Sequence, residues 1–372
     1  MNIVWLSWKD RKNPLAGGAE LVNEALARQL VAHGHRVKLI VGGFSGAKPK
    51  ETIDGYEVIR LGGRVTVYYQ AWRYYVREDL ADWADLVIDE VNTVPFFAKF
   101  YAHKPTVVFA HMLCRQIWWY ELFFPASLVG YLAEPLYLRL LSDQAVVTVS
   151  ESTKHDLMRF GFKKAKISII PEIIETPPVT SPSYIKKYPR PTVLSLGAVK
   201  PMKRTLEIVR AFELAKTDLP KLQLIVAGRP EGAYGKRVLR ACRQSQYARD
   251  IKCLGAVAPA KRAELMQKSH LLAVTSVKEG WGLVVSEAAS QGTPAVVYDV
   301  DGLRDSVRDG RTGLVAKFNT PQALATSIAA ALKNQSKYDT MRVSAWKSAR
   351  DLTAEKSYQV FIKILEGAGE QR

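Results

Sequence analysis

Cysteine is scarce in this chain of 372 residues, which holds only three. Cys114, Cys242 and Cys253 have no metal-ligand spacing, and we interpret all three as structural. An odd count without a disulfide framework fits a reducing cytoplasm. The sequence therefore excludes disulfide-rich secreted domains and zinc fingers.

A secretory signal and a membrane-spanning helix are also missing from the pattern of the sequence. Residues 1–9 lack the basic start, long apolar core and small-residue cleavage site of an export signal. The longest apolar stretch, residues 122–141, contains two prolines, a glutamate and an arginine, whereas a spanning helix needs roughly 20 predominantly apolar residues. We expect a cytoplasmic protein in which this stretch forms an interfacial or core helix.

Acidic side chains are too few to balance the basic ones. The 36 Asp and Glu residues face 53 Lys and Arg residues, which gives a formal net charge of +17. Such an excess indicates an anionic partner. Because the chain has no Lys/Arg-rich arm and no RNA-binding sheet signature, we expect no nucleic-acid partner. An anionic membrane surface and a sugar nucleotide remain as candidates.

What the sequence does contain is a regular alternation of short β-branched runs with segments of helical period. This alternation predicts an α/β fold with parallel sheets covered by helices. The helix with the clearest apolar period covers residues 19–33. The predicted strands cover residues 3–6, 37–41, 57–60, 86–89, 106–110, 145–149 and 167–170, and then 192–196, 223–227, 251–253, 271–274, 295–297 and 313–315.

A proline-rich run at residues 175–184 separates the two series of strands. Its prolines can neither continue a helix nor join a central strand. We predict an N-terminal Rossmann-like domain of residues 1–175, a linker of residues 176–190 and a C-terminal Rossmann-like domain of residues 191–352. We expect the apolar stripe of residues 353–372 to form a helix that completes the first domain. Two such domains would face each other across a cleft.

Two carboxylates eight positions apart, Glu279 and Glu287, lie around a glycine-flanked turn and the start of an apolar helix. If the helix starts near Leu283, its unpaired amides lie between the carboxylates, and the helix dipole favours an anion there. A phosphorylated ligand could bind these amides while both carboxylates accept hydrogen bonds from its hydroxyls. A solvated helix face is the open alternative.

Two further loops after predicted strands are candidate anion sites. Gly17 and Gly18 precede a helix, where the missing Cβ atoms would let a ligand reach free amides, although such a pair also serves in tight turns. The three spaced glycines of the dinucleotide fingerprint are absent, so no nicotinamide or flavin cofactor is expected. Lys203 and Arg204 lie near a helix start and oppose its dipole, which favours a phosphate partner over a purely solvated surface.

His111 directly follows the predicted strand of residues 106–110. Open α/β sheets bind ligands at this edge, beyond the carboxyl ends of their strands. A histidine there could position or polarise a bound group. A structural histidine is the open alternative.

Taken together and in order, these motifs resemble the retaining, nucleotide-sugar-dependent glycosyltransferases of family 4. The resemblance spans nearly the whole chain, and residues 279–313 carry its most specific part. It implies a GT-B architecture of two Rossmann-like domains with parallel sheets facing across a deep cleft, a nucleotide-diphosphate-sugar as co-substrate, and neither a cofactor nor a metal. The motifs that carry it are Gly17-Gly18-Ala19-Glu20, His33-Gly34-His35-Arg36-Val37, His111, Ser150-Glu151-Ser152, the Lys203 loop, Glu279 to Glu287 and Asp309-Gly310-Arg311-Thr312-Gly313.

The resemblance also implies roles for single residues. Lys203 would neutralise the diphosphate as the glycosidic bond breaks. Glu279 would contact the donor sugar and Glu287 the ribose, while His111 would lie beside the transferred sugar. We class His111, Glu279 and Lys203 as catalytic and expect the base near residues 255–257. With Glu287, the remaining substrate-binding residues are Gly17, Gly18, Gly197, Lys200, Arg204, Val257, Gly280, Trp281, Gly282, Leu283 and Val284.

The chain departs from the family pattern at two places. Ala198 stands where the family usually has an arginine, so one diphosphate cation is missing unless Lys200 or Arg204 replaces it. Pro171 is followed by Glu172 rather than by the usual Asn-Gly.

The expected function is retaining transfer of a hexose to an acceptor. Aromatic and basic residues at 115–124 favour a lipid-linked, glycolipid or polysaccharide-precursor acceptor on the cytoplasmic face of the membrane, with an aromatic core cluster as the open alternative. A soluble synthase that uses a small sugar or polyol acceptor is a second interpretation. A non-catalytic nucleotide-sugar-binding protein, which Ala198 would favour, is a third.

Overall fold

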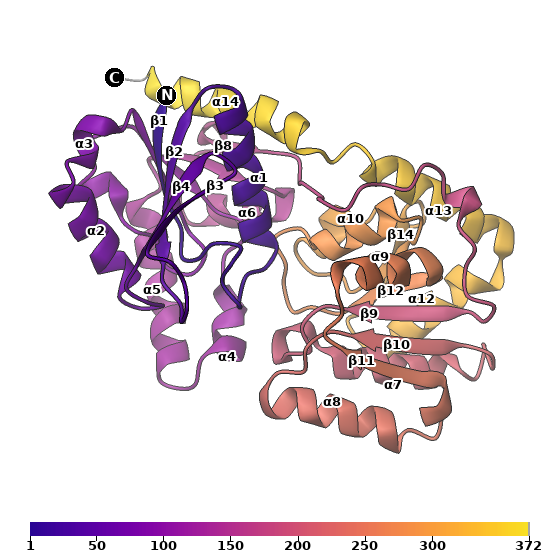
Figure 1. Ribbon diagram of the computed structural model, residues 1–372. Helices are drawn as coiled ribbons and strands as arrows, with labels where there is room; N and C mark the ends of the chain where they lie inside the picture. The colour runs from indigo at the N-terminus through magenta and orange to yellow at the C-terminus, as the bar shows by residue number, and fades with distance from the viewer. Residues whose placement is uncertain (371–372) are drawn as a thin grey trace. The chain divides into compact units, whose positions relative to one another are not determined.

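The computed structural model describes residues 1–370, and the chain divides into two compact units (Figure 1). Unit 1 comprises Met1–Glu175 and the C-terminal segment that begins at Leu352, whereas unit 2 comprises Thr176–Asp351. Each unit is built on its own sheet.

The sheet of unit 1 has eight strands in the order β3-β4-β2-β1-β5-β6-β7-β8. All neighbours are parallel except β3 and β4, which are antiparallel. The seven predicted strands are present, with boundaries that differ by one residue at most at either end. The strands are β1 (Asn2–Leu6), β2 (Arg36–Gly42), β3 (Lys50–Ile53), β4 (Tyr56–Leu61), β5 (Leu86–Glu90), β6 (Thr106–Phe109), β7 (Ala145–Thr148) and β8 (Ile167–Ile169).

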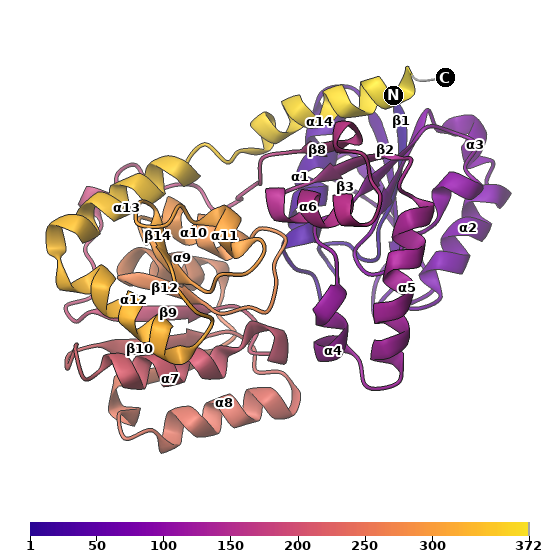
Figure 2. The ribbon, with the colours of Figure 1, turned by 180° about the vertical axis from the view of Figure 1, so that it is seen from behind.

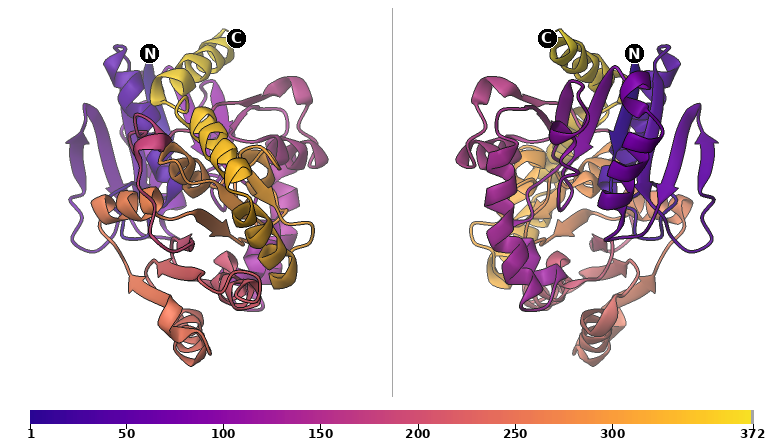
Figure 3. Two further views of the ribbon diagram at one scale, coloured as in Figure 1. Left: turned by 90° about the vertical axis from the view of Figure 1, so that its right-hand side faces the viewer. Right: turned by 90° about the vertical axis from the view of Figure 1, so that its left-hand side faces the viewer.

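The edge strand β3 was not predicted, and its pairing makes the sheet mixed rather than wholly parallel. It consists of Lys50-Glu51-Thr52-Ile53, whose residues alternate between exposed and half-buried. An edge strand needs no continuous apolar run, because one side of its backbone and much of its surface stay in water. The hairpin that β3 forms with β4 lies at the outer edge of the unit (Figure 3).

The helices of unit 1 cover its sheet, and the C-terminal helix α14 is one of them. Phe361 of α14 packs against Trp5 and Phe109, with ring centroids 5.7 and 5.9 Å away, and the α14 helix runs beside α1 (Figure 2). The helices are α1 (Gly18–Ala32), α2 (Val67–Arg77), α3 (Leu80–Trp83), α4 (Trp118–Glu121), α5 (Ala126–Leu140), α6 (Glu151–Arg159) and α14 (Ala354–Gly369), with 3-10 turns η1 (Ala98–Phe100), η2 (Arg115–Ile117) and η3 (Lys164–Lys166).

The sheet of unit 2 has six strands, all parallel, in the order β11-β10-β9-β12-β13-β14. Separate apolar cores lie against it, one around Phe212 and Leu224 and another around Leu272 and Val285. Its strands are β9 (Thr192–Leu196), β10 (Gln223–Ala227), β11 (Ile251–Gly255), β12 (Leu271–Val274), β13 (Ala295–Val297) and β14 (Gly313–Val315).

The helices of unit 2 follow its strands in the α/β pattern that the sequence predicts. They are α7 (Thr205–Ala215), α8 (Gly232–Gln244), α9 (Pro259–Lys268), α10 (Leu283–Ser290), α11 (Leu303–Ser306), α12 (Pro321–Lys333) and α13 (Gln335–Ala349), with 3-10 turns η4 (Pro182–Tyr184), η5 (Pro201–Lys203) and η6 (Ala248–Asp250).

The structure differs from the prediction at residues 176–190, which we expected to be a linker. This segment belongs to unit 2 and is hydrogen-bonded along it: the amide of Val179 donates to the carbonyl of Ser290, and the amide of Tyr188 donates to that of Lys268. The Lys187 ammonium donates to the carbonyl of Gly292, 2.8 Å away. The prolines leave the short turn η4 as the regular structure of this segment, but they do not prevent packing.

The apolar stretch of residues 122–141 forms α5 and the turn before it. One face of α5 is buried through Glu134, Tyr137 and Leu138, while the other face exposes apolar side chains. The sequence predicted an interfacial or core helix, and α5 has features of both: one face is buried and the other exposes apolar side chains. Among residues 1–370, no helix is long and apolar enough to cross a membrane.

Candidate functional site

The strand order of unit 2 determines where its polar loops meet. The chain runs outward from β9 to β10 and β11 and then returns to β12 on the other side of β9. The loops that follow β9 and β12 therefore diverge from neighbouring strands, which is the switch point at which open α/β sheets bind ligands. Lys203 follows β9, and Glu279 follows β12.

Lys203 and Glu279 form an ion pair at this switch point. The Lys203 Nζ lies 2.5 Å from Oε1 of Glu279, and the hydroxyl of Ser276 donates to the same oxygen. The hydroxyl of Thr275 donates to the carbonyls of Lys203 and Arg204, 3.0 and 3.1 Å away, so the backbones of the two loops are tied together. The pair keeps contact with water, because the Lys203 side chain is 30% exposed and that of Glu279 is 14% exposed.

Helix α10 begins at Leu283, as the sequence predicts, and Gly282 caps it with φ of +88°. A Cβ at Gly282 would lie 2.8 Å from a side-chain carbon of Leu303, so both conformation and space require glycine there. The indole N–H of Trp281 donates to the hydroxyl of Ser286 and fixes the turn. Because Leu283 and Val284 belong to the first helical turn, their amides have no intrahelical acceptors.

Glu287 lies on the second turn of α10 and pairs with Arg262 of α9. Its carboxylate is 6% exposed, whereas the Arg262 side chain is 40% exposed. The pair places a carboxylate and a guanidinium at the rim of the same edge of the sheet. The sequence did not single out Arg262, since it lies on an exposed helix 25 residues from its partner.

The glycine after β10, Gly228, is required by the loop that follows β9. Gly197 has φ of +131°, and a Cβ on Gly228, which follows β10, would lie 1.7 Å from the carbonyl oxygen of Gly197. The amide of Gly228 donates to the carbonyl of Gly255, 2.7 Å away, so the loop that begins near Val257 is joined to the same edge. Val257 is half-buried and packs against the core of unit 2.

The two cations considered as replacements at Ala198 occupy different positions. Lys200 is the N-cap of η5, whereas Arg204 caps α7 in a left-handed conformation with φ of +52°. The Arg204 Nε donates to Glu207, 2.7 Å away, and its guanidinium lies over the ring of Tyr298. A non-glycine residue in this conformation is strained, and such strain clusters at functional sites.

In unit 1 the switch point lies between β1 and β5. Gly17 caps α1, and the carboxylate of Glu20 accepts a hydrogen bond from the Gly17 amide, 2.6 Å away. The Lys9 ammonium lies 3.6 Å from Glu20. A Cβ at Gly17 would meet only Glu20, at the ordinary distance of 3.7 Å, so packing within the protein does not require this glycine. Gly18 is the first residue of the helix.

His111 follows β6 and is joined to β5 through α1. Its Nε2 lies 2.9 Å from Oδ1 of Asn23, whose Nδ2 donates to Oε2 of Glu90, 2.8 Å away. Burial lowers the pKa of His111 to about 3 and raises the pKa of Glu90 to about 8, the latter with a smaller contribution from Glu20. At neutral pH both side chains are therefore mainly uncharged. Sequence patterns pointed to His111 but not to Asn23 or Glu90.

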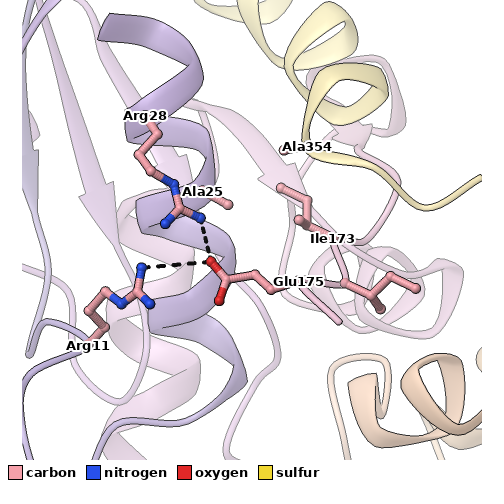
Figure 4. A pocket seen from close by; sticks show the side chains of 7 residues that line it. Arg11, Ala25, Arg28, Ile173, Glu175 and Ala354 are labelled. Atoms are coloured by element: carbon pink, nitrogen blue, oxygen red, sulfur yellow. Dashed lines mark hydrogen bonds and ion pairs between the residues drawn. The ribbon is translucent and has the colours of Figure 1, made fainter. Parts of the chain in front are cut away.

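A separate shallow cavity of about 410 Å³ opens on unit 1. Arg11 and Arg28 both point at the carboxylate of Glu175 within it (Figure 4), with 3.7 Å between Arg11 Nη1 and Glu175 Oε1. None of the predicted site residues lines this cavity. In residues 1–370, no group of three or more His, Cys, Asp or Glu side chains is arranged to hold a metal ion.

Two family models match the chain, one for each unit. The model described as glycosyl transferases group 1 matches residues 180–348, and the model described as glycosyltransferase family 4 matches residues 16–176. The chain belongs to the group 1 glycosyltransferases of family 4. The matched ranges contain every residue that the sequence assigned to the site.

The solved structures that are similar to this member of the family have the GT-B fold. Sucrose-phosphate synthase from Thermosynechococcus elongatus aligns with a TM-score of 0.79 at 17% identity and covers 98% of this chain and 99% of its own. HepE of Anabaena, solved in complex with UDP and glucose, aligns with a TM-score of 0.71 at 18% identity over 99% of this chain and 100% of its own. The predicted GT-B fold class is thus confirmed.

Curated relatives with similar sequences are D-inositol 3-phosphate glycosyltransferases. The protein from Rhodococcus opacus is 28% identical over 45% of this chain and 39% of its own length. The protein from Rhodococcus erythropolis is 32% identical over 34% of this chain and 29% of its own length. The match therefore spans less than half the length of each of these relatives.

Proposed function

We propose that the protein transfers a hexose from a nucleotide-diphosphate-sugar to an acceptor hydroxyl, with retention of the anomeric configuration and without a metal. The observation that carries this proposal is the Lys203–Glu279 pair at the switch point of unit 2, next to the first turn of α10. The pair combines a cation for the diphosphate with a carboxylate for sugar hydroxyls. The complex of HepE with UDP-glucose supports the choice of UDP-glucose as a first donor probe.

In the proposed reaction the donor diphosphate replaces Glu279 as the partner of Lys203. Cationic and amide donors stabilise negative charge best where it grows in the transition state. Lys203 and the amides of Leu283 and Val284 would therefore stabilise the departing nucleotide diphosphate, while Glu279 accepts hydrogen bonds from the sugar. Glu287 would hold the ribose hydroxyls. His111 would bind the transferred sugar.

The acceptor is proposed to be a lipid-linked or glycolipid precursor at the cytoplasmic face of a membrane. An apolar stripe on α5, together with the turn before it, supports this choice, and α4 and α5 extend from their sheet (Figure 2). Trp118 is buried, but the aromatic residues after it are exposed, so a core cluster accounts for only part of this stretch. The exposed apolar side chains are Trp119, Tyr120, Phe123, Phe124, Val129, Leu132, Leu136 and Leu140.

A small phosphorylated polyol is the second candidate acceptor. It is favoured by the relatives named D-inositol 3-phosphate glycosyltransferase. The two acceptors are separated by comparing turnover of UDP-glucose, once identified as a donor, with inositol phosphate in solution and with a polyprenyl-phosphate-linked sugar in anionic vesicles. Turnover with only the soluble compound would eliminate the membrane acceptor.

The donor is tested first by thermal shift with a set of nucleotide sugars. A ligand at 100 times its dissociation constant stabilises the folded protein by about 2.7 kcal/mol. The identified donor is then used in a turnover assay with wild-type protein and Glu279→Gln, in the presence and absence of EDTA. An enzyme loses turnover in the variant, whereas a binding protein turns over nothing in either form. Loss of wild-type turnover in EDTA would eliminate the metal-free part of the proposal.

A further inference from the structure

The polar chain that ends at His111 runs from the interior of unit 1 to its surface. Glu90 is fully buried and Asn23 is 2% exposed, whereas 10% of the His111 side chain is exposed. Three elements contribute to it, since Glu90 ends β5, Asn23 lies on α1 and His111 follows β6. His111 is thus the member of the chain that a ligand can reach.

The hydrogen bonds of Asn23 determine which ring nitrogen of His111 carries the proton. The Nδ2 of Asn23 donates to Glu90, so its Oδ1 is the atom that faces His111 Nε2, 2.9 Å away. An amide oxygen can only accept a hydrogen bond, so this orientation of the Asn23 amide requires the proton on Nε2. In a neutral imidazole the other nitrogen, Nδ1, is then a hydrogen-bond acceptor. No other residue in the part of the chain that the structure describes hydrogen-bonds to Nδ1.

The ring of His111 is also held in place from other directions. Phe109 stacks on it, with ring centroids 4.4 Å apart and an angle of 27° between the planes. The hydroxyl of Thr153 donates to the His111 carbonyl, 3.3 Å away. Since Phe109 itself packs against Phe361 of α14, the ring lies on an aromatic layer that belongs to the core of the unit.

If Glu90, Asn23 and His111 served only to pack the interior, a carboxyl at position 90 would be unfavourable. Its Oε1 is buried and has no hydrogen-bond partner, and it lies 3.9 Å from His111 Nε2. Glu20 on α1 raises the pKa of Glu90 beyond the effect of burial, so the two carboxyls disfavour each other's ionisation. An apolar side chain of similar size would avoid the cost of this unsatisfied oxygen. Burial of this carboxyl therefore lowers the stability of the folded protein.

We propose that Asn23 and Glu90 are positioning residues that keep the proton on Nε2 of His111 and thereby present Nδ1 as the acceptor for a hydroxyl group of the sugar substrate. This inference rests on the proposed glycosyl transfer. It goes beyond the family resemblance, which assigns a role to His111 alone. Here the position of the proton on the His111 ring depends on the Glu90 carboxyl, which is two hydrogen bonds away.

The kinetic test compares apolar and conservative substitutions of the two positioning residues. We expect Asn23→Leu and Glu90→Leu to lower kcat by about a hundredfold, with the KM for the donor changing less than threefold, because the ring loses its orientation but the donor loop remains. Glu90→Gln keeps an acceptor for Asn23, so its kcat should be at least tenfold higher than that of Glu90→Leu. Folded leucine variants that keep kcat within threefold would overturn the proposal.

A spectroscopic test can be made on protein without measurable activity, and it leaves Asn23 and Glu90 unchanged. A histidine-selective ¹⁵N spectrum of the wild-type protein should show His111 as a neutral ring with its proton on Nε2, assigned by the loss of its signals in His111→Gln. A proton on Nδ1, or an averaged signal of both tautomers, would overturn the proposal even if the leucine variants failed to fold. If the tautomer is as expected but the wild type has no transferase activity, the proposed function fails while the positioning chain stands.

Discussion

The two units bring polar residues to equivalent edges of their sheets, but they hold them differently. In unit 2, Lys203 and Glu279 are charged and partly exposed, so water and an arriving ligand can compete for each of them. In unit 1, Asn23 and Glu90 are buried and hydrogen-bonded to each other, and Glu90 is mainly uncharged at neutral pH. The ion pair of unit 2 can exchange its partners for those of a ligand, whereas the buried hydrogen bonds of unit 1 hold their side chains in place.

Removing the exchangeable cation should have the largest effect. We expect Lys203→Ala to lower kcat by about 10²–10³-fold, because the developing charge on the diphosphate loses its cation. The free energy of unfolding should change by less than ~1 kcal/mol, since a partly exposed ion pair adds little stability. Steady-state kinetics and thermal unfolding check both. Lys261→Ala, which breaks an exposed ion pair with Glu264 on α9, is the matched control and should leave kcat unchanged.

The carboxylate on α10 should affect binding more than chemistry. In Glu287→Gln the ribose hydroxyls lose a charged acceptor worth about 1.5 kcal/mol, so the KM for the donor should rise roughly tenfold while kcat changes little. The variant also frees Arg262 from its partner. Arg262→Gln distinguishes the two causes: an equal rise in KM there would mean that the ion pair, not the ribose contact, carries the effect.

The buried carboxyl of unit 1 should make stability depend on pH. Its folded-state pKa is raised to about 8 from an ordinary value of 4.5, so its favourable contribution is complete below pH 4.5 and is lost as the pH rises to about 8. The amide in Glu90→Gln does not titrate. Between these pH values the free energy of unfolding of the variant should therefore rise relative to that of the wild type, by a few kcal/mol at most. Urea unfolding at pH 5, 7 and 9 measures the gap, and a constant gap would contradict the expected titration. Glu172 shows the same direction of shift and is unchanged in both proteins.

The exposed stripe on α5 should have the smallest effect on the folded protein. Leu132→Ser with Leu136→Ser should change the free energy of unfolding by no more than about 0.5 kcal/mol per residue, because both side chains are exposed. Flotation with anionic vesicles should fall several-fold if this face contacts lipid. Leu214→Ser, at an exposed position on α7, is the control. Equal flotation of the double variant and this control would contradict the proposed membrane contact.

Most of the fold could be predicted because most of its parallel strands are short runs rich in β-branched and other apolar residues. Such runs identified thirteen of the strands, and the helical stripe at residues 353–372 indicated a helix with one apolar face. The edge strand β3 was missed because Lys50-Glu51-Thr52-Ile53 carries no such run. The packing of residues 176–190 on unit 2 was not predicted, because proline content disfavours long helices and central strands but says nothing about packing on a neighbour.

The sequence singled out candidate site residues only where they lie close together in the chain or match a family motif. Glu279, Gly282 and Glu287 share one segment, and the start of α10 between them was expected. The partners of His111 could not be found in this way, because Asn23 is 88 residues from His111 and 67 from Glu90. Neither residue type is unusual in an α/β protein, and only the fold shows that they are buried and joined.

The position of α14 in unit 1 has a consequence for the order of folding during synthesis. Phe361 packs against both Trp5 and Phe109, which also contact each other, so this aromatic cluster of unit 1 needs a segment that follows all of unit 2 in the chain. Unit 2 is contiguous and can close its core as soon as it leaves the ribosome. The aromatic cluster of unit 1 is therefore completed only after α14 has been translated.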